Sequence, residues 1–359
     1  MQTEIIQPQR STALSASPRE VYRLMLLIRR FEEEVERQYM RARVGGYCHV
    51  ASGQEAATVG AVGAMTEEDL LFTSYRTHGF ALARGCDPGA VMGELFGRED
   101  GSARGRGGSM HLLDVERRFF GGWGIVGGQL PIAVGAGLAL VHRNMNHAVV
   151  CELGDGAANI GAWHEALNLA AIWQLPVVFL VLNNRYAMGT SVERASAEPE
   201  LHRRAAAYRM RGEQVDGQDV EAVADAAAFL LDRARTAREP AVLEVVTYRY
   251  RGHSVADPGT SYRSETERES WQARDPLTLY GDVLRDRNLV DEADLLDLEA
   301  EVATTVEEAV GFAERSAEPA VDTLGHHVYG DPATARQFAR MAPGSPFGEI
   351  ELVLGGLGA

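Results

Sequence analysis

The sequence contains no lysine, so all 35 of its Lys and Arg positions are arginines. This absence excludes two common kinds of cofactor site. A phosphate loop of the G-x-x-x-x-G-K-[ST] type needs a lysine that reaches the phosphates. An enzyme that uses pyridoxal phosphate needs a lysine that forms a Schiff base with it. The chemistry of this chain must therefore rest on other residue types.

Cysteine is scarce as well. The thiols Cys48, Cys86 and Cys151 have no C-x-x-C spacing and an odd total, which favours a reducing compartment and argues against a disulfide framework or a zinc site. No apolar run is long enough to span a bilayer, and the first twenty residues contain no apolar segment typical of a secretory signal. We therefore expect a protein of the bacterial cytoplasm.

The sequence has fewer basic than acidic residues. The 51 Asp and Glu residues outnumber the arginines and give a net charge of −16 at pH 7, with a pI near 5.1. Non-specific binding to nucleic acid or to an anionic membrane needs a basic surface, so neither partner is expected. At 359 residues and 45% hydrophobic composition, the chain can bury a substantial core.

Alternating strand and helix patterns predict an α/β protein. Residues 148–153, 177–182 and 241–248 read as buried strands, and helical patterns lie between and around them. Such repeats imply a mainly parallel central sheet with helices on both faces. The predicted helical segments are residues 21–43, 129–141, 219–238 and 289–317. We divide the chain into an N-terminal extension at residues 1–20, one large α/β domain at residues 21–330 and a C-terminal tail at residues 331–359.

The most informative motif joins two of these strands. Gly154-Asp155-Gly156 follows the first strand, and Asn183-Asn184 follows the second. Magnesium prefers oxygen ligands, so Asp155, the Asn184 side-chain oxygen and a nearby carbonyl would suit a magnesium-bound diphosphate. The two glycines permit close backbone approach, and a helix expected to start near Ala157 would point its free N–H groups at the anion.

A dinucleotide-binding fingerprint explains the same segment less well. That motif needs glycine at the third position of G-x-G-x-x-G and an acidic residue after the next strand. Here Asn159 occupies the first of these places, and Asn183-Asn184 occupies the second. The pattern therefore fails at two points.

The stretch from Gly154-Asp155-Gly156 to Asn183-Asn184 resembles the signature of thiamin-diphosphate enzymes. The surrounding motifs resemble the alpha chains of pyruvate dehydrogenase first components, and the likeness runs from about residue 21 to about residue 330. These motifs are Tyr75-Arg76-Thr77-His78-Gly79, Gly107-Gly108-Ser109-Met110-His111, Gly124-Ile125-Val126-Gly127 and Asn183-Asn184-Arg185-Tyr186-Ala187-Met188-Gly189-Thr190-Ser191. The resemblance implies a thiamin-diphosphate-binding fold with thiamin diphosphate and Mg²⁺ as cofactors.

Site residues follow from this resemblance, one position at a time. It implies diphosphate contacts from Tyr75, Arg76, Gly156, Ala157 and His253, backbone contacts to the aminopyrimidine ring from Gly124 and Val126, and Mg²⁺ ligands from Asp155, Asn184 and the Tyr186 carbonyl. His253 is also implied to take part in catalysis. His49 and His78 are further catalytic candidates, although a lone histidine is as readily explained by a structural role.

The resemblance also implies a reaction and its partners. Thiamin diphosphate would decarboxylate a small 2-oxo acid, and the acyl group would pass to a lipoylated dihydrolipoyl acyltransferase. In the resembled family, a separate beta chain supplies the glutamate that acts on the aminopyrimidine. The chain is then half of an active site, and by analogy two alpha and two beta chains form a heterotetramer.

Several alternatives stay open at this point. Gly252-His253-Ser254 resembles chains that act on pyruvate, but acetoin and branched-chain 2-oxo acids remain possible substrates. A non-catalytic diphosphate-binding scaffold is a third possibility, although intact Asp155, Asn184 and His253 argue against it. Ser254 and Ser261 match phosphorylation sites of mitochondrial relatives, and here we interpret them as plain loop serines. Departures from the family pattern occur at Trp123, Ala187 and Arg251, and none of them removes a metal or diphosphate ligand.

Overall fold

A computed structural model describes residues 13–323 of the chain. They belong to two units, one that ends at Glu318 and one that begins at Pro319, in which the short 3-10 turn Val321–Thr323 is described. The predicted C-terminal tail, residues 331–359, lies outside the described residues, so the predicted division at residue 330 stays a prediction. Among residues 13–323, no helix is long and apolar enough to cross a membrane.

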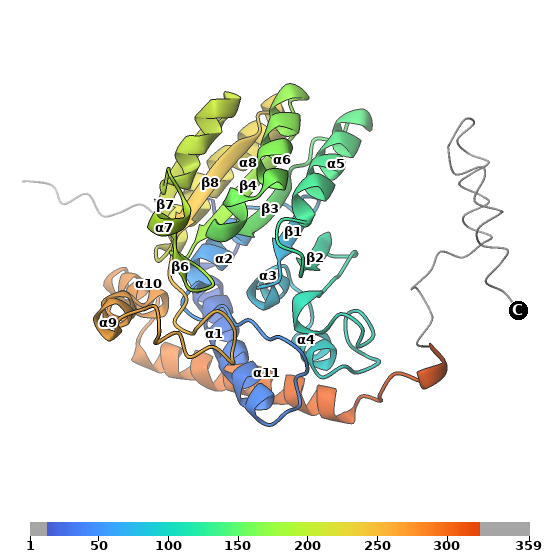
Figure 1. Ribbon diagram of the computed structural model, residues 1–359. Coiled ribbons are helices and arrows are strands. Elements are labelled where there is room, and N and C mark those ends of the chain that lie inside the picture. Colours follow the sequence, from blue (N-terminus) through green and yellow to red (C-terminus); the bar gives the residue numbers. More distant parts are fainter. Residues whose placement is uncertain (1–12, 324–359) are drawn as a thin grey trace, which may run out of the picture. The chain divides into compact units, whose positions relative to one another are not determined.

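A six-stranded parallel sheet forms the centre of the first unit (Figure 1). Its spatial order is β2-β1-β3-β4-β8-β7, and every neighbouring pair is parallel. The strands are β1 Leu70–Ser74, β2 Phe119–Trp123, β3 Val149–Gly154, β4 Val177–Asn183, β7 Arg211–Asp216 and β8 Ala241–Val246. A separate antiparallel pair joins β5 Tyr186–Ala187 to β6 Thr190–Ser191. The predicted α/β fold with a mainly parallel sheet is confirmed.

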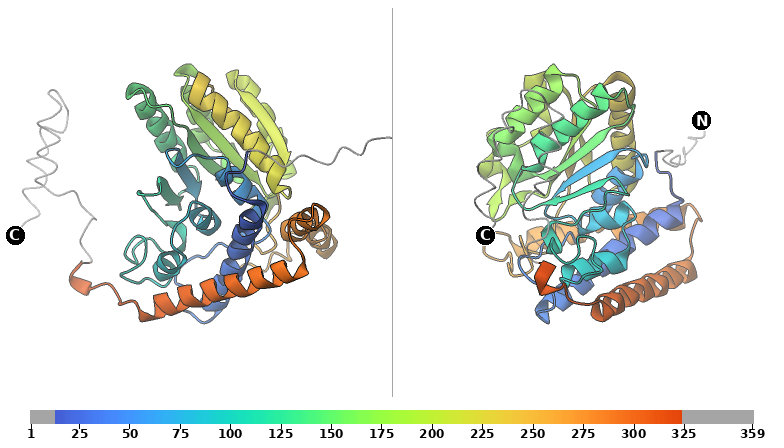
Figure 2. Two further views of the ribbon diagram at one scale, coloured as in Figure 1. Left: turned by 180° about the vertical axis from the view of Figure 1, so that it is seen from behind. Right: turned by 90° about the vertical axis from the view of Figure 1, so that its right-hand side faces the viewer.

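Helices cover both faces of the sheet, as the two views in Figure 2 show. The strands are buried on both sides, so alternate residues of one strand enter two different cores. In β4, Val178, Leu180 and Leu182 join the larger core, and Val177, Phe179 and Val181 join the smaller one. The larger core is built with α1 Pro18–Met40, α2 Glu55–Gly63, α3 His78–Ala83, α4 Pro88–Leu95, α8 Val220–Ala237, α10 Pro276–Asp286 and α11 Glu292–Arg315. The smaller core is built with α5 Gln129–His142 and α6 Gly161–Ile172.

Local sequence explains where the long helices start. In α1, Pro18 occupies the first turn and the Ser17 side chain accepts a hydrogen bond from the Glu20 N–H. In α11, Asp291 and Asp294 form a reciprocal capping box. Both helices bury an apolar stripe against neighbouring helices, which agrees with the helical patterns at residues 21–43 and 289–317. Two short helices, α7 Val192–Ala195 and α9 Glu265–Gln272, complete the α-helices of the described residues.

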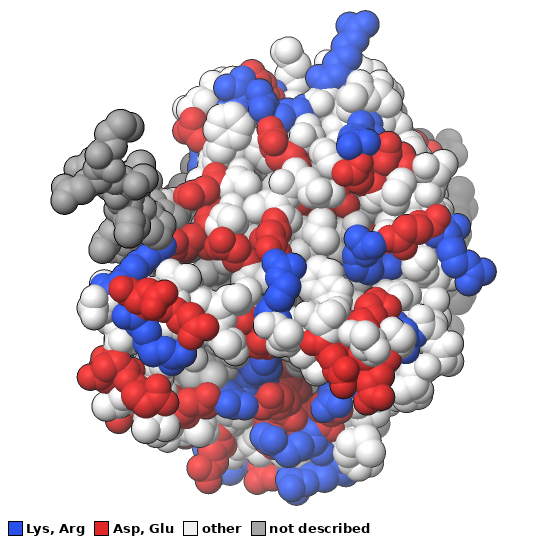
Figure 3. All heavy atoms as spheres, turned by 90° about the vertical axis from the view of Figure 1, so that its left-hand side faces the viewer, with Lys and Arg blue, Asp and Glu red and all other residues white. Residues whose placement is uncertain are grey.

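Charged side chains of both signs cover the surface shown in Figure 3. Arginines and acidic residues are interspersed there, and no broad basic area is visible on that face. Ion pairs on the described part of the chain include Arg233 with Glu239 at 2.6 Å and Arg274 with Asp216. The acidic surplus therefore does not collect into one patch on this side.

The topology creates a crevice at the carboxyl edge of the sheet. After β1 the chain enters α3, which packs in the larger core, whereas after β3 it enters α6, which packs in the smaller core. The loops that leave these two adjacent strands therefore diverge to opposite faces. In open parallel sheets, ligands bind where neighbouring connections separate in this way. The residues that follow β1, β3, β4 and β8 meet at this crevice.

Candidate active site

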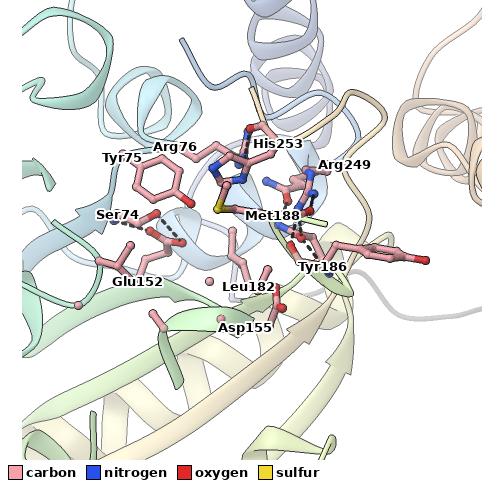
Figure 4. Close-up of a pocket in the computed structure, with 18 of the residues that line it drawn as sticks. Ser74, Tyr75, Arg76, Glu152, Asp155, Leu182, Tyr186, Met188, Arg249 and His253 are labelled. Carbon is pink, nitrogen blue, oxygen red and sulfur yellow. Dashed lines mark hydrogen bonds between the residues drawn. The ribbon is translucent and has the colours of Figure 1, made fainter. Parts of the chain in front are cut away.

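A cavity of about 230 Å³ lies at this crevice (Figure 4). Nine of the residues predicted from the sequence line it: Tyr75, Arg76, Val126, Asp155, Gly156, Ala157, Asn184, Tyr186 and His253. Gly124, His49 and His78 are not among its lining residues. The remaining lining residues are Gln54, Ser74, Gly127, Gln129, Glu152, Gly154, Leu182, Ala187, Met188 and Arg249. Segments far apart in the sequence therefore share one site.

Asp155 is a buried carboxyl that lacks a full set of partners. It is 2% exposed, and its Oδ2 atom has no hydrogen-bond partner among the described residues. Burial raises the pKa of Asp155 to about 6, and the nearby positive charge of Arg249 opposes this increase. An unpartnered buried carboxylate oxygen is costly, so a cation at this position would stabilise the ionised form.

Two further oxygen atoms face the same part of the cavity. The Asn184 side chain donates through Nδ2 to Gln54 Oε1 at 3.1 Å, which orients Oδ1 as an acceptor. The Tyr186 side chain donates from its hydroxyl to Glu267 at 2.8 Å and points away from the cavity (Figure 4). Its backbone carbonyl accepts a hydrogen bond from Arg249, another lining residue. The sequence predicted these two oxygens, together with Asp155, as metal ligands.

Arg249 lines the cavity and was not among the predicted site residues. Its guanidinium is 1% exposed and donates from Nη1 to Asn184 Oδ1 at 2.7 Å and to the Tyr186 carbonyl at 2.6 Å. It also donates from Nη2 to the Met188 carbonyl at 2.5 Å. A buried cation thus contacts two of the three predicted metal ligands. The available signal was an arginine directly after a buried strand end, in Tyr248-Arg249-Tyr250.

Backbone close to Asp155 is accessible to a ligand. A Cβ atom added at Gly156 would lie 2.6 Å from the Ala187 Cβ, so glycine is required there. Ala187, one of the departures from the family pattern, therefore packs against the glycine turn. The predicted helix start near Ala157 is wrong: Asp155–Asn159 is a 3-10 turn, and α6 begins at Gly161 after Ile160 adopts an extended conformation.

Arg76 lies on the opposite wall and links two loops. It donates to the Val50 carbonyl at 2.6 Å and to the His253 carbonyl at 2.9 Å. Both acceptors are neutral, so these bonds leave the positive charge uncompensated, and burial lowers the pKa of Arg76. A buried guanidinium in this position is suited to an anion such as a phosphate.

His49, Tyr75 and His253 form an aromatic cluster beside Arg76. The ring of His49 lies 4.5 Å from that of Tyr75 and 5.0 Å from that of His253, measured between centroids. Burial, reinforced by the Arg76 charge, lowers the pKa of His49 to about 3 and that of His253 to about 4. Both imidazoles are therefore neutral near pH 7. His49 packs behind the lining residues, and its Nδ1 atom has no partner in the described part of the chain.

His78 is held in a different environment. Its Nδ1 lies 2.8 Å from Glu32 Oε2 and its Nε2 lies 2.9 Å from Ser109 Oγ, and the ring is fully buried. Both ring nitrogens thus have protein partners, and the residue does not line the cavity. This arrangement supports the structural alternative for His78.

The loop that carries His253 is organised by one carboxylate. Asp257 accepts hydrogen bonds from the His253 N–H at 2.6 Å, the Gly259 N–H at 2.8 Å and the Tyr262 hydroxyl at 2.5 Å. These contacts hold the pKa of Asp257 below its usual value, although burial opposes the effect. Ser254 is half-buried and Ser261 is exposed on this loop. The position of His253 is therefore fixed by the protein.

The mouth of the cavity is apolar. Ile125 is 76% exposed, Met188 is 65% exposed, and Val126 is half exposed beside them. A Cβ atom at Gly124 would lie 2.9 Å from the His111 ring, so a side chain there would require the ring to move. The exposed residues Ile125, Val126 and Met188 leave this segment open to a ligand or a partner surface.

Glu152 is the second acid of the cavity and was not anticipated. It lies in β3, is 2% exposed and accepts hydrogen bonds from the Ser74 N–H at 2.7 Å and the Ser74 hydroxyl at 3.3 Å. Burial raises its pKa to about 7. The sequence signal was a single charged residue inside an otherwise apolar strand, Cys151-Glu152-Leu153, which local patterns cannot interpret.

The donor set fits a hard divalent cation next to an anion. Asp155, the Asn184 amide and the Tyr186 carbonyl are the oxygen types that Mg²⁺ prefers, and two guanidiniums flank them. No cluster of three or more His, Cys, Asp or Glu suited to a metal occurs in residues 13–323, so a softer all-side-chain metal site is not found there. The geometry supports a magnesium-bound phosphate ligand.

Comparison with known proteins gives a consistent result. The model of the dehydrogenase E1 component family matches residues 22–322. The pyruvate dehydrogenase E1 component subunit alpha of Rhizobium meliloti is 44% identical over 304 residues, which cover 84% of this chain and 87% of that protein. The protein of the same description from Rickettsia bellii is 42% identical over 305 residues, 85% of this chain and 93% of its own length. The human somatic mitochondrial form is 40% identical over 309 residues, covering 86% and 78%.

Proposed function

Because this chain belongs to the dehydrogenase E1 component family, we propose that it is the alpha subunit of a pyruvate dehydrogenase first component. It takes part in the oxidative decarboxylation of pyruvate, with thiamin diphosphate as the cofactor, and in transfer of the acetyl group to a lipoyl domain. Bound thiamin diphosphate supplies the nucleophilic carbon and the electron sink that this reaction needs. The observation that carries the proposal is the unpartnered Oδ2 of Asp155 among phosphate-binding groups.

The chain's own residues would hold the cofactor by its charged end. Asp155, Asn184 and the Tyr186 carbonyl would bind Mg²⁺, and Arg76 and Arg249 would bind the diphosphate, since all five residues line the cavity. Each contact is charge-assisted, and each is stronger in a cavity that excludes water. The Gly156 and Ala157 backbone completes this end of the site, which fixes the cofactor before any substrate enters.

Neutral histidines occupy the side of the cavity near Tyr75. Because their pKa values are lowered to about 4 and about 3, His253 and His49 are uncharged near pH 7. A neutral imidazole accepts a proton at one nitrogen and donates one from the other. We assign His253 to the end of the site where the substrate reacts. His49 packs against the His253 ring and supports its position. His78 acts through packing.

A beta subunit completes the site. The exposed apolar residues Ile125, Val126 and Met188 at the cavity mouth support burial against such a partner. We propose two alpha and two beta chains, with a lipoylated dihydrolipoyl acyltransferase as the acyl acceptor. The proposed location is the bacterial cytoplasm.

The test is turnover by the chain co-expressed with a beta chain of the same family. Pyruvate, acetoin and 2-oxoisovalerate are supplied separately with Mg²⁺, thiamin diphosphate and an artificial electron acceptor. We expect selective turnover of pyruvate. Preference for acetoin or the branched-chain acid would change the substrate and keep the cofactor, and no turnover of any of them would favour the scaffold alternative.

A matched variant separates chemistry from assembly. Asp155→Asn keeps the shape of the side chain and removes the charge that Mg²⁺ needs. The variant should assemble with the beta chain, as judged by size-exclusion chromatography, and should lose pyruvate turnover. Wild-type activity in Asp155→Asn would contradict the assignment of the metal ligand.

A further inference from the structure

Glu152 lies where a strand would normally place an apolar side chain. Its neighbours in β3, Cys151 and Leu153, pack in the smaller core with α5 and α6. The alternation of a strand therefore points Glu152 to the opposite side, where it lines the cavity together with Tyr75 and Arg76 (Figure 4). An ionisable group is thus built into the wall of the cofactor cavity.

The partners of Glu152 do not compensate a negative charge. Among residues 13–323, the hydrogen bonds to its carboxylate come from one residue, through the backbone N–H and the hydroxyl of Ser74. Arg76 lowers the pKa of Glu152 only partly, because its own hydrogen bonds run to the Val50 and His253 carbonyls. Burial is the larger effect and raises the pKa of Glu152 to about 7.

The other charged groups around Glu152 come from each element that borders the cavity. Tyr75 and Arg76 follow β1, Asp155 lies in the turn after β3, and Arg249 and His253 follow β8. The uncharged residues Ser74, at the end of β1, and Gln129, at the start of α5, lie beside them. The negative charge of Glu152 raises the pKa of the Tyr75 hydroxyl, although burial has the larger effect. Asp155 is a second acid on the same wall. A diphosphate would therefore add negative charge to a cavity that already holds two acids.

We propose that Glu152 is a proton-linked positioning residue. Its carboxylate takes up a proton from solvent when the diphosphate of the cofactor binds, and the resulting neutral carboxylic acid continues to hold the end of β1. The inference rests on the proposed function, since it needs thiamin diphosphate as the ligand. A carboxylate and a diphosphate repel each other in a water-poor cavity, whereas a carboxylic acid does not.

The neutral acid keeps its contact with β1. Oε2 still accepts from the Ser74 N–H, and a proton on Oε1 can be donated to the Ser74 hydroxyl. Ser74 directly precedes Tyr75 and Arg76, so this contact fixes the position of the backbone that leads into the proposed diphosphate-binding residues. Protonation therefore removes the charge of Glu152 and preserves its positioning role.

The experiment measures cofactor affinity as a function of pH. The assembled alpha and beta chains are freed of cofactor, saturated with Mg²⁺ and titrated with thiamin diphosphate by calorimetry between pH 7.0 and 8.5. Two buffers with different ionisation enthalpies report the protons taken up. For the wild type we expect uptake of close to one proton at pH 8 and affinity that falls by up to about tenfold per pH unit.

Two variants isolate the carboxyl group. Glu152→Gln mimics the neutral acid, so its affinity should be nearly independent of pH over this range and its proton uptake should disappear. Ser74→Ala keeps the titrating carboxyl and loses only the hydroxyl contact, so its pH dependence should persist. Ionisation of the cofactor itself is common to all three proteins and cancels in the comparison.

The outcomes are distinct. Equal pH dependence in wild type and Glu152→Gln would overturn the inference and leave the proposed function intact. Absence of proton uptake by the wild type at pH 8 would also overturn it, even if Glu152→Gln failed to fold. Absence of thiamin diphosphate binding at every pH would refute the proposed function and, with it, this inference.

Discussion

Two buried glutamates of the same sheet differ in how the protein treats their charge. Glu244, in β8, accepts hydrogen bonds from Asn183 Nδ2 at 2.7 Å, the His202 N–H at 3.0 Å and Gln214 Nε2 at 3.1 Å, and His202 Nδ1 lies 2.8 Å from it. These donors outweigh burial and lower its pKa. In the described part of the chain, the carboxylate of Glu152, in β3, accepts hydrogen bonds from Ser74 alone, and burial raises its pKa to about 7.

The aspartates Asp69 and Asp155 repeat this contrast. Asp69, just before β1, accepts from the Ala148 N–H at 2.7 Å and the Thr66 N–H at 2.8 Å and pairs with Arg235. Its pKa is lowered despite burial, whereas that of Asp155 is raised to about 6. The protein itself stabilises the negative charges of Glu244 and Asp69, which lie away from the cavity. Glu152 and Asp155, which line the cavity, lack a full set of hydrogen-bond donors in the described part of the chain, so a ligand or a proton can compensate their charge.

Removing a fully bonded acid should have the largest effect. Glu244→Leu would leave the buried Asn183 amide and the partly buried His202 N–H and ring without their acceptor, and the exposed Gln214 amide would lose the same partner. We expect the free energy of unfolding to fall by about 3–5 kcal/mol, measured by urea denaturation. Glu152→Leu is the comparison, and it should cost clearly less because only Ser74 loses its partner. Equal losses in the two variants would show that the number of donors does not decide the outcome.

Removing an acid of the cavity should affect binding and not folding. Asp155→Ala should weaken Mg²⁺-dependent binding of thiamin diphosphate by about a hundredfold or more, roughly 3 kcal/mol, because the only carboxylate among the proposed ligands is lost. Isothermal titration calorimetry of the assembled enzyme measures this loss. The melting temperature should not fall, since an unpartnered buried oxygen is removed. If Asp155→Ala still bound thiamin diphosphate tightly, Asp155 would not be a metal ligand.

Arg249 offers a sharper comparison with its neighbour Arg251. Arg249→Met should weaken cofactor binding by about ten- to thirtyfold, roughly 1.4–2 kcal/mol, as expected for loss of a buried charge-assisted contact. Arg251 is exposed and pairs with Glu36 at 2.8 Å, so Arg251→Met should leave the affinity unchanged. Parallel calorimetric titrations compare the two variants. A similar loss in both would indicate an effect of net charge and not of the cavity.

The fold was predictable because its signals are local. The apolar run at residues 177–183 and the capping residues Ser17 and Asp219 mark a strand and two helix starts without knowledge of tertiary structure. The short strands β1, β2 and β7 and the helices α2, α3, α4 and α10 were not predicted. The turn after Asp155 was predicted wrongly. There Ile160 adopts an extended conformation that separates a 3-10 turn from α6, and no residue type in that stretch announces the break.

The site was only partly predictable, because its remaining contacts are long-range. Asp155, Asn184 and Tyr186 lie in motifs and were found, and the structure places them around one cavity. Arg249 donates to Asn184 across 65 sequence positions, which no local spacing reveals. Glu152 was missed for a related reason, since its pKa depends on how few donors the fold brings to it. Residue identity alone does not tell Glu152 from Glu244.

The smallest effect concerns stability as a function of pH in Glu152→Gln. The folded-state pKa of Glu152 is raised to about 7 from an ordinary value of 4.5, so its stabilising contribution is complete below about pH 4.5 and is lost as the pH rises through 7. Glutamine does not titrate. The stability of the variant relative to wild type should therefore increase by about 1 kcal/mol between pH 6 and pH 8.

Denaturation of both proteins without cofactor at the two pH values measures this, and Glu244→Gln is the control. Glu244 is already ionised throughout that range, so its variant should show no such increase. If the difference between wild type and Glu152→Gln stayed constant from pH 6 to pH 8, Glu152 would be a satisfied acid like Glu244, and the contrast between the two glutamates would fail.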